Sequence, residues 1–447
     1  MQRAARVTDE RAEPLPVATT IASPALRRTS TRVAVAIAVG GAIVLILAGL
    51  LPPAQILSRP NRGDVEEYYH YTQRTFDGQV PYRDFVLEYP PGALPVLLAA
   101  APADSGYFNR FRLLMLGLVV AAMGLLVTAM FLGGGGPVEL ASGALLLATL
   151  PLTLEEGLVF ERYDLWPTAL VLLSAVALLR GHRTLGLASL GLGAAAKLYP
   201  LALVPIAILA RRGHAHLRRD LAVVAVAGLA LALPFAVLAP RGLGHVGWLL
   251  VRRPLHVESL GGSVLLVAHR FGAYHPTIYL SIGQSWDLAG PAAKLVAVVS
   301  ALLEAAALVT VWILFSRGRR GPRDLLLAFA ATVVGFVAFG KILSPQYLIW
   351  VAAAVPLALG RIRPYAFALA LGAILLTRYV YVYGYDDLLR AGPVSWVMLA
   401  RNGLLVALFC LLAAELAART RSSPRPTPEH RVPARDELPT PHRPAQA

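Results

Sequence analysis

The fold is decided at residues 33–92, where two stretches of opposite character follow one another. The first, VAVAIAVGGAIVLILAGLL (33–51), is apolar and close to the roughly 20 residues that a helix needs to cross a bilayer. The second, DVEEYYHYTQRTFDGQVPYRDFVLEYPPG (64–92), crowds carboxylates, tyrosines and arginines into one polar segment. A segment that only connects two membrane helices needs no such content, so we expect these residues to do chemistry at a membrane surface.

The composition of the whole chain predicts a membrane protein. The 447 residues are 57% hydrophobic and 15% charged, whereas a soluble domain has about 25% charged residues. Backbone groups in lipid must be satisfied internally, so the repeated apolar runs are expected to be helices. The only cysteine, Cys410, lies in such a run, and no Cys/His cluster is visible. We therefore predict an all-α polytopic membrane protein with neither metal nor cofactor.

Twelve membrane helices are predicted within one domain, residues 33–419. The flanking segments 1–32 and 420–447 are polar and rich in proline and charge, and both are expected to be disordered and cytoplasmic. The run 184–210 is divided at Lys197-Leu198-Tyr199-Pro200, because proline disfavours helix in the residue before it. The predicted helices span 33–52, 110–132, 137–154, 165–179, 184–198, 200–210, 220–239, 292–316, 324–341, 346–359, 364–380 and 394–418.

The charges predict how these helices are oriented. Starting from a cytoplasmic N-terminus, every strongly basic short loop falls inside: 180–184, 211–219, 317–323 and 360–363. The net charge of +15 is therefore interpreted as topology, not as affinity for nucleic acid. The acids of the first loop and of later loops fall outside the plasma membrane. Residues 92–102, GALPVLLAAAP, are too short to cross and are predicted to form a juxtamembrane helix.

Asp64 is the candidate general base. It lies soon after the first apolar run, and a carboxylate at a membrane surface can accept the proton of a hydroxyl group. The simpler alternative is a solvated acidic loop. The mixture of charge and aromatic surface in PYRDF (81–85) and EYPPG (88–92) suits a sugar beside a phosphate, although an interfacial aromatic belt has a similar composition.

Basic residues that follow helix ends are the candidates for binding an anionic lipid phosphate. Lys197 lies at the predicted helix break, and Lys341 begins KILSPQY (341–347). An ionisable group within membrane helices is costly and is therefore a candidate for function. Snorkelling of the side chain to the interface is the alternative for both, and it is preferred for Lys294. The predicted phosphate-binding set is Lys197, Arg83, Arg162 and Lys341.

Further polar and aromatic residues in the outer loops are predicted to bind substrate. Asp164 in RYD (162–164) could instead cap the next helix, and RPLHVES (253–259) could be an amphipathic surface segment. His256 could also act as a base. The predicted substrate-binding set is Glu66, Tyr68, Tyr82, Asp84, Glu88, Tyr89, Asp164, Tyr199, His256, Glu258, Gln346 and Tyr347.

Together these motifs resemble glycosyltransferase family 87, the polyprenyl-phosphate-mannose-dependent α-mannosyltransferases of actinobacteria with the GT-C architecture. The matching residues run from Asp64 and PYRDF through KLYP (197–200) to KILSPQY, and the resemblance covers most of 33–419. It implies an inverting transfer of a hexose from a polyprenyl-phosphate sugar to a hydroxyl of a lipid-linked or cell-envelope glycan, and mannose is the first candidate for this hexose. It also implies that the acid early in the first outer loop, here Asp64, is the base.

Two alternatives stay open. Related GT-C enzymes use other lipid-linked sugars, including arabinofuranose. A transporter or flippase of lipid-linked sugars would also have many helices and basic contacts to lipid phosphate. Transporters often contain inverted repeats with paired broken helices near the midplane, and this sequence has no convincing internal repeat. Its acids instead gather on one predicted side, which favours an enzyme.

Overall fold

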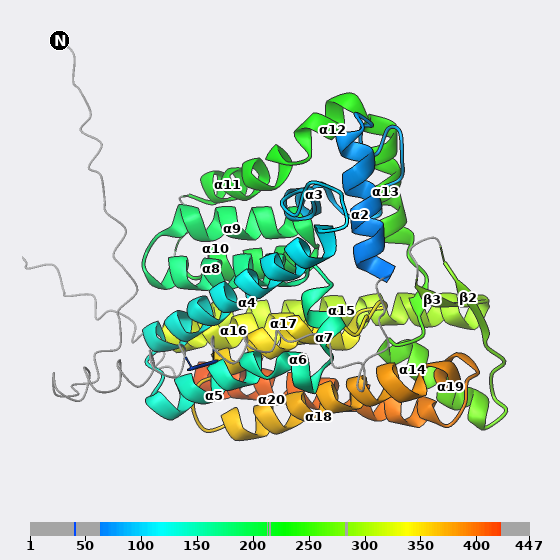
Figure 1. The fold of residues 1–447 in the computed structure, drawn as a ribbon. Helices are drawn as coiled ribbons and strands as arrows, with labels where there is room; N and C mark the ends of the chain where they lie inside the picture. Colours follow the sequence, from blue (N-terminus) through cyan, green and yellow to red (C-terminus); the bar gives the residue numbers. More distant parts are fainter. Residues whose placement is uncertain (1–39, 42–62, 212, 214–215, 282–284, 422–447) are drawn as a thin grey trace, which may run out of the picture.

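The computed structural model describes residues 40–41, 63–211, 213, 216–281 and 285–421, and these residues are mostly helical (Figure 1). The predicted helix 33–52 and both predicted tails lie almost entirely outside the described residues. Five of the described helices are long and apolar enough to cross a membrane. They are α4 (Tyr107–Leu132), α15 (Pro291–Arg317), α16 (Pro322–Phe339), the stretch Arg363–Leu389, and α20 (Val394–Arg421).

Other predicted spans are present as shorter apolar helices. The predicted break in 184–210 is present: α9 ends at Ala196, Lys197 has an extended backbone, and the next turn begins at Tyr199 before Pro200. Several other predicted helices are interrupted, and each second piece has a proline in its first turn. The shorter helices are α5 (Pro137–Ala148), α6 (Leu150–Thr153), α8 (Leu165–Leu179), α9 (Arg183–Ala196), η2 (Tyr199–Leu203), α10 (Val204–Leu209), α17 (Tyr347–Ala354) and η3 (Val355–Leu357).

The polar segment after the first apolar run is not the loop that was expected. Residues Gly63–Phe76 form the helix α2, in which Val65, Tyr68 and Thr72 are buried at helical spacing. The predicted juxtamembrane helix 92–102 is shorter than expected and consists of η1 (Pro91–Ala93) and α3 (Leu94–Leu98). The chain therefore reaches the first long helix through ordered elements.

The later outer segment also contains regular structure that was not predicted. The expected helix 220–239 is divided into α11 (Leu217–Ala230) and α12 (Leu233–Leu238), and the amphipathic helix α13 (Pro240–Arg252) follows. An antiparallel sheet with strand order β1-β3-β2 corrects the all-α prediction. The helix α14 (Leu260–Arg270) lies between β1 and β2 in the sequence. The strands are β1 (Leu255–His256), β2 (Thr277–Leu280) and β3 (Trp286–Ala289).

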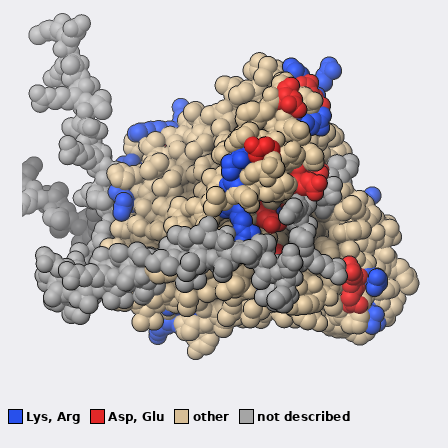
Figure 2. Space-filling model, in the orientation of Figure 1, with Lys and Arg blue, Asp and Glu red and all other residues tan. Residues whose placement is uncertain are grey.

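The two ends of the helix bundle differ in chemistry. At one end, segments that were predicted to be cytoplasmic contact one another: Arg323 donates to the carbonyls of Gly133 and Gly134, and Arg419 pairs with Asp324. The opposite end carries α2, α13, α14 and the sheet (Figure 1). The acidic side chains in view in Figure 2 gather at this second end, and a tan, uncharged band covers much of the bundle between the ends.

Candidate functional site

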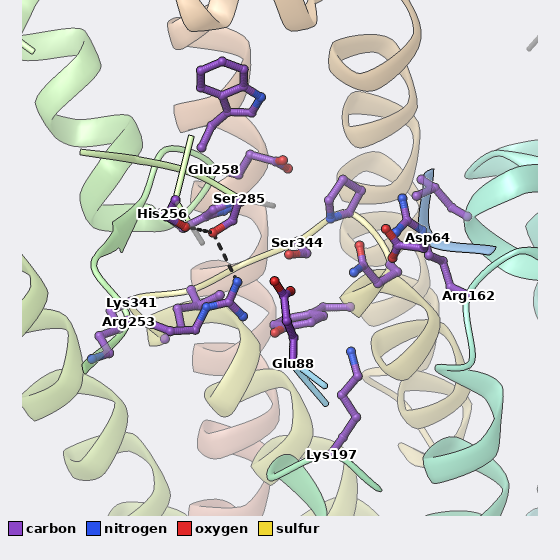
Figure 3. A pocket seen from close by; sticks show the side chains of 18 of the residues that line it. Asp64, Glu88, Arg162, Lys197, Arg253, His256, Glu258, Ser285, Lys341 and Ser344 are labelled. Carbon is purple, nitrogen blue, oxygen red and sulfur yellow. Dashed lines mark hydrogen bonds and ion pairs between the residues drawn. The ribbon is translucent and has the colours of Figure 1, made fainter. Parts of the chain in front are cut away.

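A cavity of about 1140 Å³ opens at the end of the bundle that carries the sheet. Its walls come mainly from the segments that connect helices (Figure 3). The link between α16 and α17 and the first residue of α17 contribute residues 340–342 and 344–347. The short helix α7 (Glu156–Phe160) and the turn after it contribute Leu158, Arg162 and Tyr163. The π-helical turn η4 (Val380–Gly384) lies between α18 (Arg363–Tyr379) and α19 (Tyr385–Leu389) and lines another wall.

Many of the residues predicted for the site line this one cavity, although they are dispersed over almost 300 positions of sequence. The fold brings them together because the helices alternate in direction and all of these segments lie at the same end. The predicted residues on the cavity wall are Asp64, Glu88, Tyr89, Arg162, Lys197, Tyr199, His256, Glu258, Lys341, Gln346 and Tyr347.

Other predicted residues are not on the cavity wall. Arg83 and Asp84 form an exposed ion pair with each other at 2.9 Å and do not line this cavity, so the phosphate-binding role of Arg83 stays a prediction. Tyr82 is buried and donates to the carbonyl of Tyr89 at 2.8 Å, which makes it a support for the Glu88–Tyr89 turn. Glu66 lies on an exposed face of α2. Tyr68 is buried against the ring of Tyr89 and supports the same turn.

Asp64 and Arg162 form an ion pair at one side of the cavity. Asp64 lies in the first turn of α2, where a carboxylate is stabilised by the helix dipole. Both side chains are only partly accessible, at 24% for Asp64 and 12% for Arg162. The pair holds a carboxylate in a fixed position on the cavity wall, as a general base requires.

Lys197 is held from behind by Asp164 and by aromatic rings. Its ammonium lies 3.3 Å from Asp164 Oδ1 and 4.9 Å from the centroid of the Tyr163 ring. Asp164 is 1% exposed and does not line the cavity, so in this structure it orients Lys197, and its predicted contact with substrate stays a prediction. The rings of Tyr89, Tyr347 and Trp350 also lie within 6.0 Å of the Lys197 ammonium.

A second cationic wall contains Lys341 and Arg253, whose side chains lie together in Figure 3. Lys341 donates to the carbonyl of Val251 at 2.8 Å, and Arg253 donates to Ser285 Oγ at 3.1 Å. Burial lowers the pKa of the Lys341 ammonium. Arg253 was absent from the predicted phosphate-binding set, although its motif RPLHVES was recognised as a candidate.

Two cavity carboxyls are shifted towards neutrality by their surroundings. Burial raises the pKa of Glu88 to about 7, and it raises the pKa of Glu258 to about 7 as well. Figure 3 shows the Glu88 side chain projecting into the middle of the cavity. His256 is different, because burial and then the charge of Arg253 lower its pKa to about 3, which leaves it a neutral ring at pH 7.

Sequence reasoning missed Arg401 and Tyr385, both of which contact Glu258. Arg401 is fully buried within α20, the last long apolar helix. An ionisable residue inside an apolar run is a candidate for function by the argument already applied to Lys197, so the signal was present. Tyr385 gave no comparable signal, because its contact depends on the π-helical turn that precedes it.

Comparison with known proteins bears on the part of the chain that supplies several of these residues. No curated protein matches the sequence. A family model does match, over a segment that contributes Glu88, Arg162 and Lys197 to the cavity. Asp64 and Lys341 lie outside the matched segment. Residues 85–253 match the model of glycosyltransferase family 87, which indicates that this membrane protein is a glycosyltransferase.

Proposed function

We propose that the protein transfers a hexose, namely a mannosyl group, from a polyprenyl phosphate to a hydroxyl of a lipid-linked or cell-envelope glycan, with inversion at the anomeric carbon. The observation that carries this proposal is the cavity that combines one fixed carboxylate, Asp64, with the cations Arg162, Lys197 and Lys341. The matched family supports a glycosyltransferase, and the long apolar helices suit a substrate that is dissolved in the membrane.

The proposed reaction needs one carboxylate to accept a proton and several cations to stabilise the leaving phosphate. Asp64 accepts the proton of the acceptor hydroxyl while that oxygen attacks the anomeric carbon. The bond between this carbon and the phosphate oxygen breaks, and its electron pair leaves with the polyprenyl phosphate. Negative charge grows on the phosphate as it departs, so the cations of the cavity stabilise the transition state. The leaving group needs no proton.

The cavity is proposed to face away from the cytoplasm. The basic segments that favour a cytoplasmic position contact one another at the opposite end of the bundle, for example through Arg323 and Arg419. Nucleotide sugars are made in the cytoplasm and do not cross the membrane, so a lipid carrier would have to deliver the sugar to such a cavity.

Purified protein in nanodiscs with radiolabelled polyprenyl-phosphate-mannose and a lipid extract as acceptor tests this function. We expect label to appear in a glycosylated lipid product, and we expect Asp64→Asn protein to form far less of it. Transfer only from polyprenyl-phosphate-arabinofuranose would overturn the mannosyl assignment. Movement of labelled donor across proteoliposomes without any new glycosidic product would identify a flippase and overturn the enzyme.

A further inference from the structure

A buried polar network surrounds Glu258 behind one wall of the cavity. The Tyr385 hydroxyl donates to Glu258 Oε1 at 3.1 Å, and the Arg401 guanidinium lies 3.7 Å from Oε2. Glu258 is 2% exposed, yet both Glu258 and Tyr385 line the cavity. The network therefore presents one carboxyl and one phenol to whatever occupies this part of the cavity.

Arg401 and its neighbour Asn402 fix the backbone at the same place. Arg401 donates to the carbonyl of Glu258 at 3.0 Å, and Asn402 Nδ2 donates to this carbonyl at 3.2 Å. Asn402 also donates to Ser263 Oγ at 2.9 Å, which ties α14 to the network. A fully buried arginine in a membrane helix is costly, so its position is best explained by a task at the cavity.

Tyr385 is brought to the cavity by an irregular helix. The turn η4 is π-helical, a form that is rare and that occurs frequently at functional sites. Tyr381 and Tyr385 pack edge to face with ring centroids 6.0 Å apart, and both line the cavity with Asp386. Aromatic rings beside a few fixed polar groups are typical of sites for small polar ligands.

The network and the candidate base line the same cavity. Glu258 and Tyr385 are on its wall together with Asp64 and Arg162, the ion-pair partner of Asp64. Figure 3 shows Glu258 on the opposite side of the cavity from Lys197. A hydroxyl that approaches Asp64 from the Glu258 side would face away from the Lys197 side.

We propose that Glu258 and Tyr385 form a subsite for a sugar of the acceptor glycan, and that Arg401 is the positioning residue that holds this subsite in place. The proposal rests on the proposed glycosyl transfer for the direction of the reaction. In the subsite, the Glu258 carboxyl hydrogen-bonds a sugar hydroxyl and the tyrosine rings cover the apolar face of the ring. A neighbouring hydroxyl of the same sugar then points towards Asp64.

Binding of radiolabelled octyl α-mannoside to protein in nanodiscs, corrected for empty nanodiscs, tests the subsite without any turnover. We expect saturable binding to the wild-type protein and about tenfold weaker binding to Glu258→Gln, which alters the group that hydrogen-bonds the sugar. Binding to Tyr385→Phe should weaken similarly, because this variant loses the hydroxyl that holds Glu258 Oε1. Binding of polyprenyl-phosphate-mannose should be unchanged in both variants. Arg401→Gln should weaken octyl mannoside binding in the same way, with Arg401→Lys retaining more of it.

A matched control removes a tyrosine hydroxyl from the same stretch, Arg363–Leu389, but outside the cavity. Tyr379 is 48% exposed and does not line the cavity, so Tyr379→Phe should bind octyl mannoside as the wild type does. The subsite would be overturned if all variants bound octyl mannoside with equal affinity or if the wild type showed no saturable binding. It would also be overturned if Tyr385→Phe lost donor binding in parallel. Failure of the transfer assay would overturn the proposed function and leave this binding result unaffected.

Discussion

At the residue scale, Asp64 is the side chain on which the proposed chemistry depends most. Asp64→Asn preserves the shape of the side chain but removes its basicity and its ion pair with Arg162. We expect turnover to fall by roughly 10²–10⁴-fold, the range typical of lost acid–base catalysis, with donor binding retained. The measurement is the rate of label transfer under saturating donor. Asp77→Asn, an exposed change at the end of α2, is the control, and near-normal turnover of Asp64→Asn would move the role of base to another carboxyl such as Glu88.

Lys197 is expected to stabilise the departing phosphate from its position beside Asp164 and Tyr163. Lys197→Met keeps the length of the side chain and deletes the charge, so donor affinity and turnover should each fall by about tenfold or more. Lys294→Met makes the same change on an exposed face of α15 and should have no effect on either quantity. If the two variants bind donor equally well, Lys197 only snorkels to the interface.

Glu88 should make the stability of the protein depend on pH. Its pKa is about 7 in the folded protein because of burial, against 4.5 for an ordinary glutamate. The stabilising effect of the protonated form is fully present below pH 4.5 and is lost as the pH rises through 7. The temperature of half-unfolding should therefore decrease as the pH is raised from 5 to 8. This decrease should be smaller in Glu88→Gln. An identical pH dependence in the variant would contradict the raised pKa of Glu88, and Asp77→Asn, which changes an exposed carboxylate, serves as the control.

At the element scale, the sequence predicted the long helices well and the connecting segments poorly. The predicted helix 292–316 nearly coincides with α15 (Pro291–Arg317), because the backbone of a long apolar run can satisfy its hydrogen bonds in lipid only as a helix. The helix α2 was missed although Val65, Tyr68 and Thr72 have helical spacing, since the polar composition dominated the interpretation. The sheet could not be predicted, because β1 is separated from its partner β3 by a helix and by β2.

For the candidate site, the sequence predicted which residues gather but not which of them contact one another. Assigning the polar loops to one side of a membrane was enough to gather Asp64, Lys197 and Lys341 into one set. The sequence could not indicate that Asp64 pairs with Arg162, because such a contact depends on how α2 packs against the turn before α8. For the same reason it could not separate Arg83, which pairs with its own neighbour, from the cations of the cavity.

The contact between α13 and the first outer segment should tolerate no side chain at Gly242. A Cβ at this position would lie 1.7 Å from the carbonyl oxygen of Tyr82, whereas a Cβ at Gly244 has no neighbour within 4 Å. We expect Gly242→Ala to lower the thermal midpoint by displacing the Tyr82 turn or α13. Gly244→Ala should leave the midpoint unchanged or raise it, since alanine is favoured over glycine within a helix by about 1 kcal/mol. Equal midpoints for the two variants would contradict this packing.

At the scale of the whole molecule, the alternating helices gather the cavity residues at one end and the arginine-rich turns at the other. Segments that enter the cavity leave their helices at one end, and the arginine-rich turns leave at the other, where Arg323, Arg363 and Arg419 bond to neighbouring turns. The described helices between the two ends are apolar and offer no comparable cluster of charges. If the bundle spans one membrane with its two ends on opposite sides, all the cavity groups lie in the same compartment.

The side of the membrane on which the cavity lies can be tested by labelling of single cysteines. In a Cys410→Ser background, Asp77→Cys places an exposed thiol at the cavity end, and His216→Cys places one at the basic end before α11. The positive-inside rule predicts that the thiol at residue 77 reacts with a membrane-impermeant maleimide in intact spheroplasts and that the thiol at 216 reacts only after permeabilisation. The two variants control for each other, because both thiols are exposed. The reverse pattern would place the cavity in the cytoplasm, where nucleotide sugars could reach it, and it would remove the reason for a lipid-linked donor.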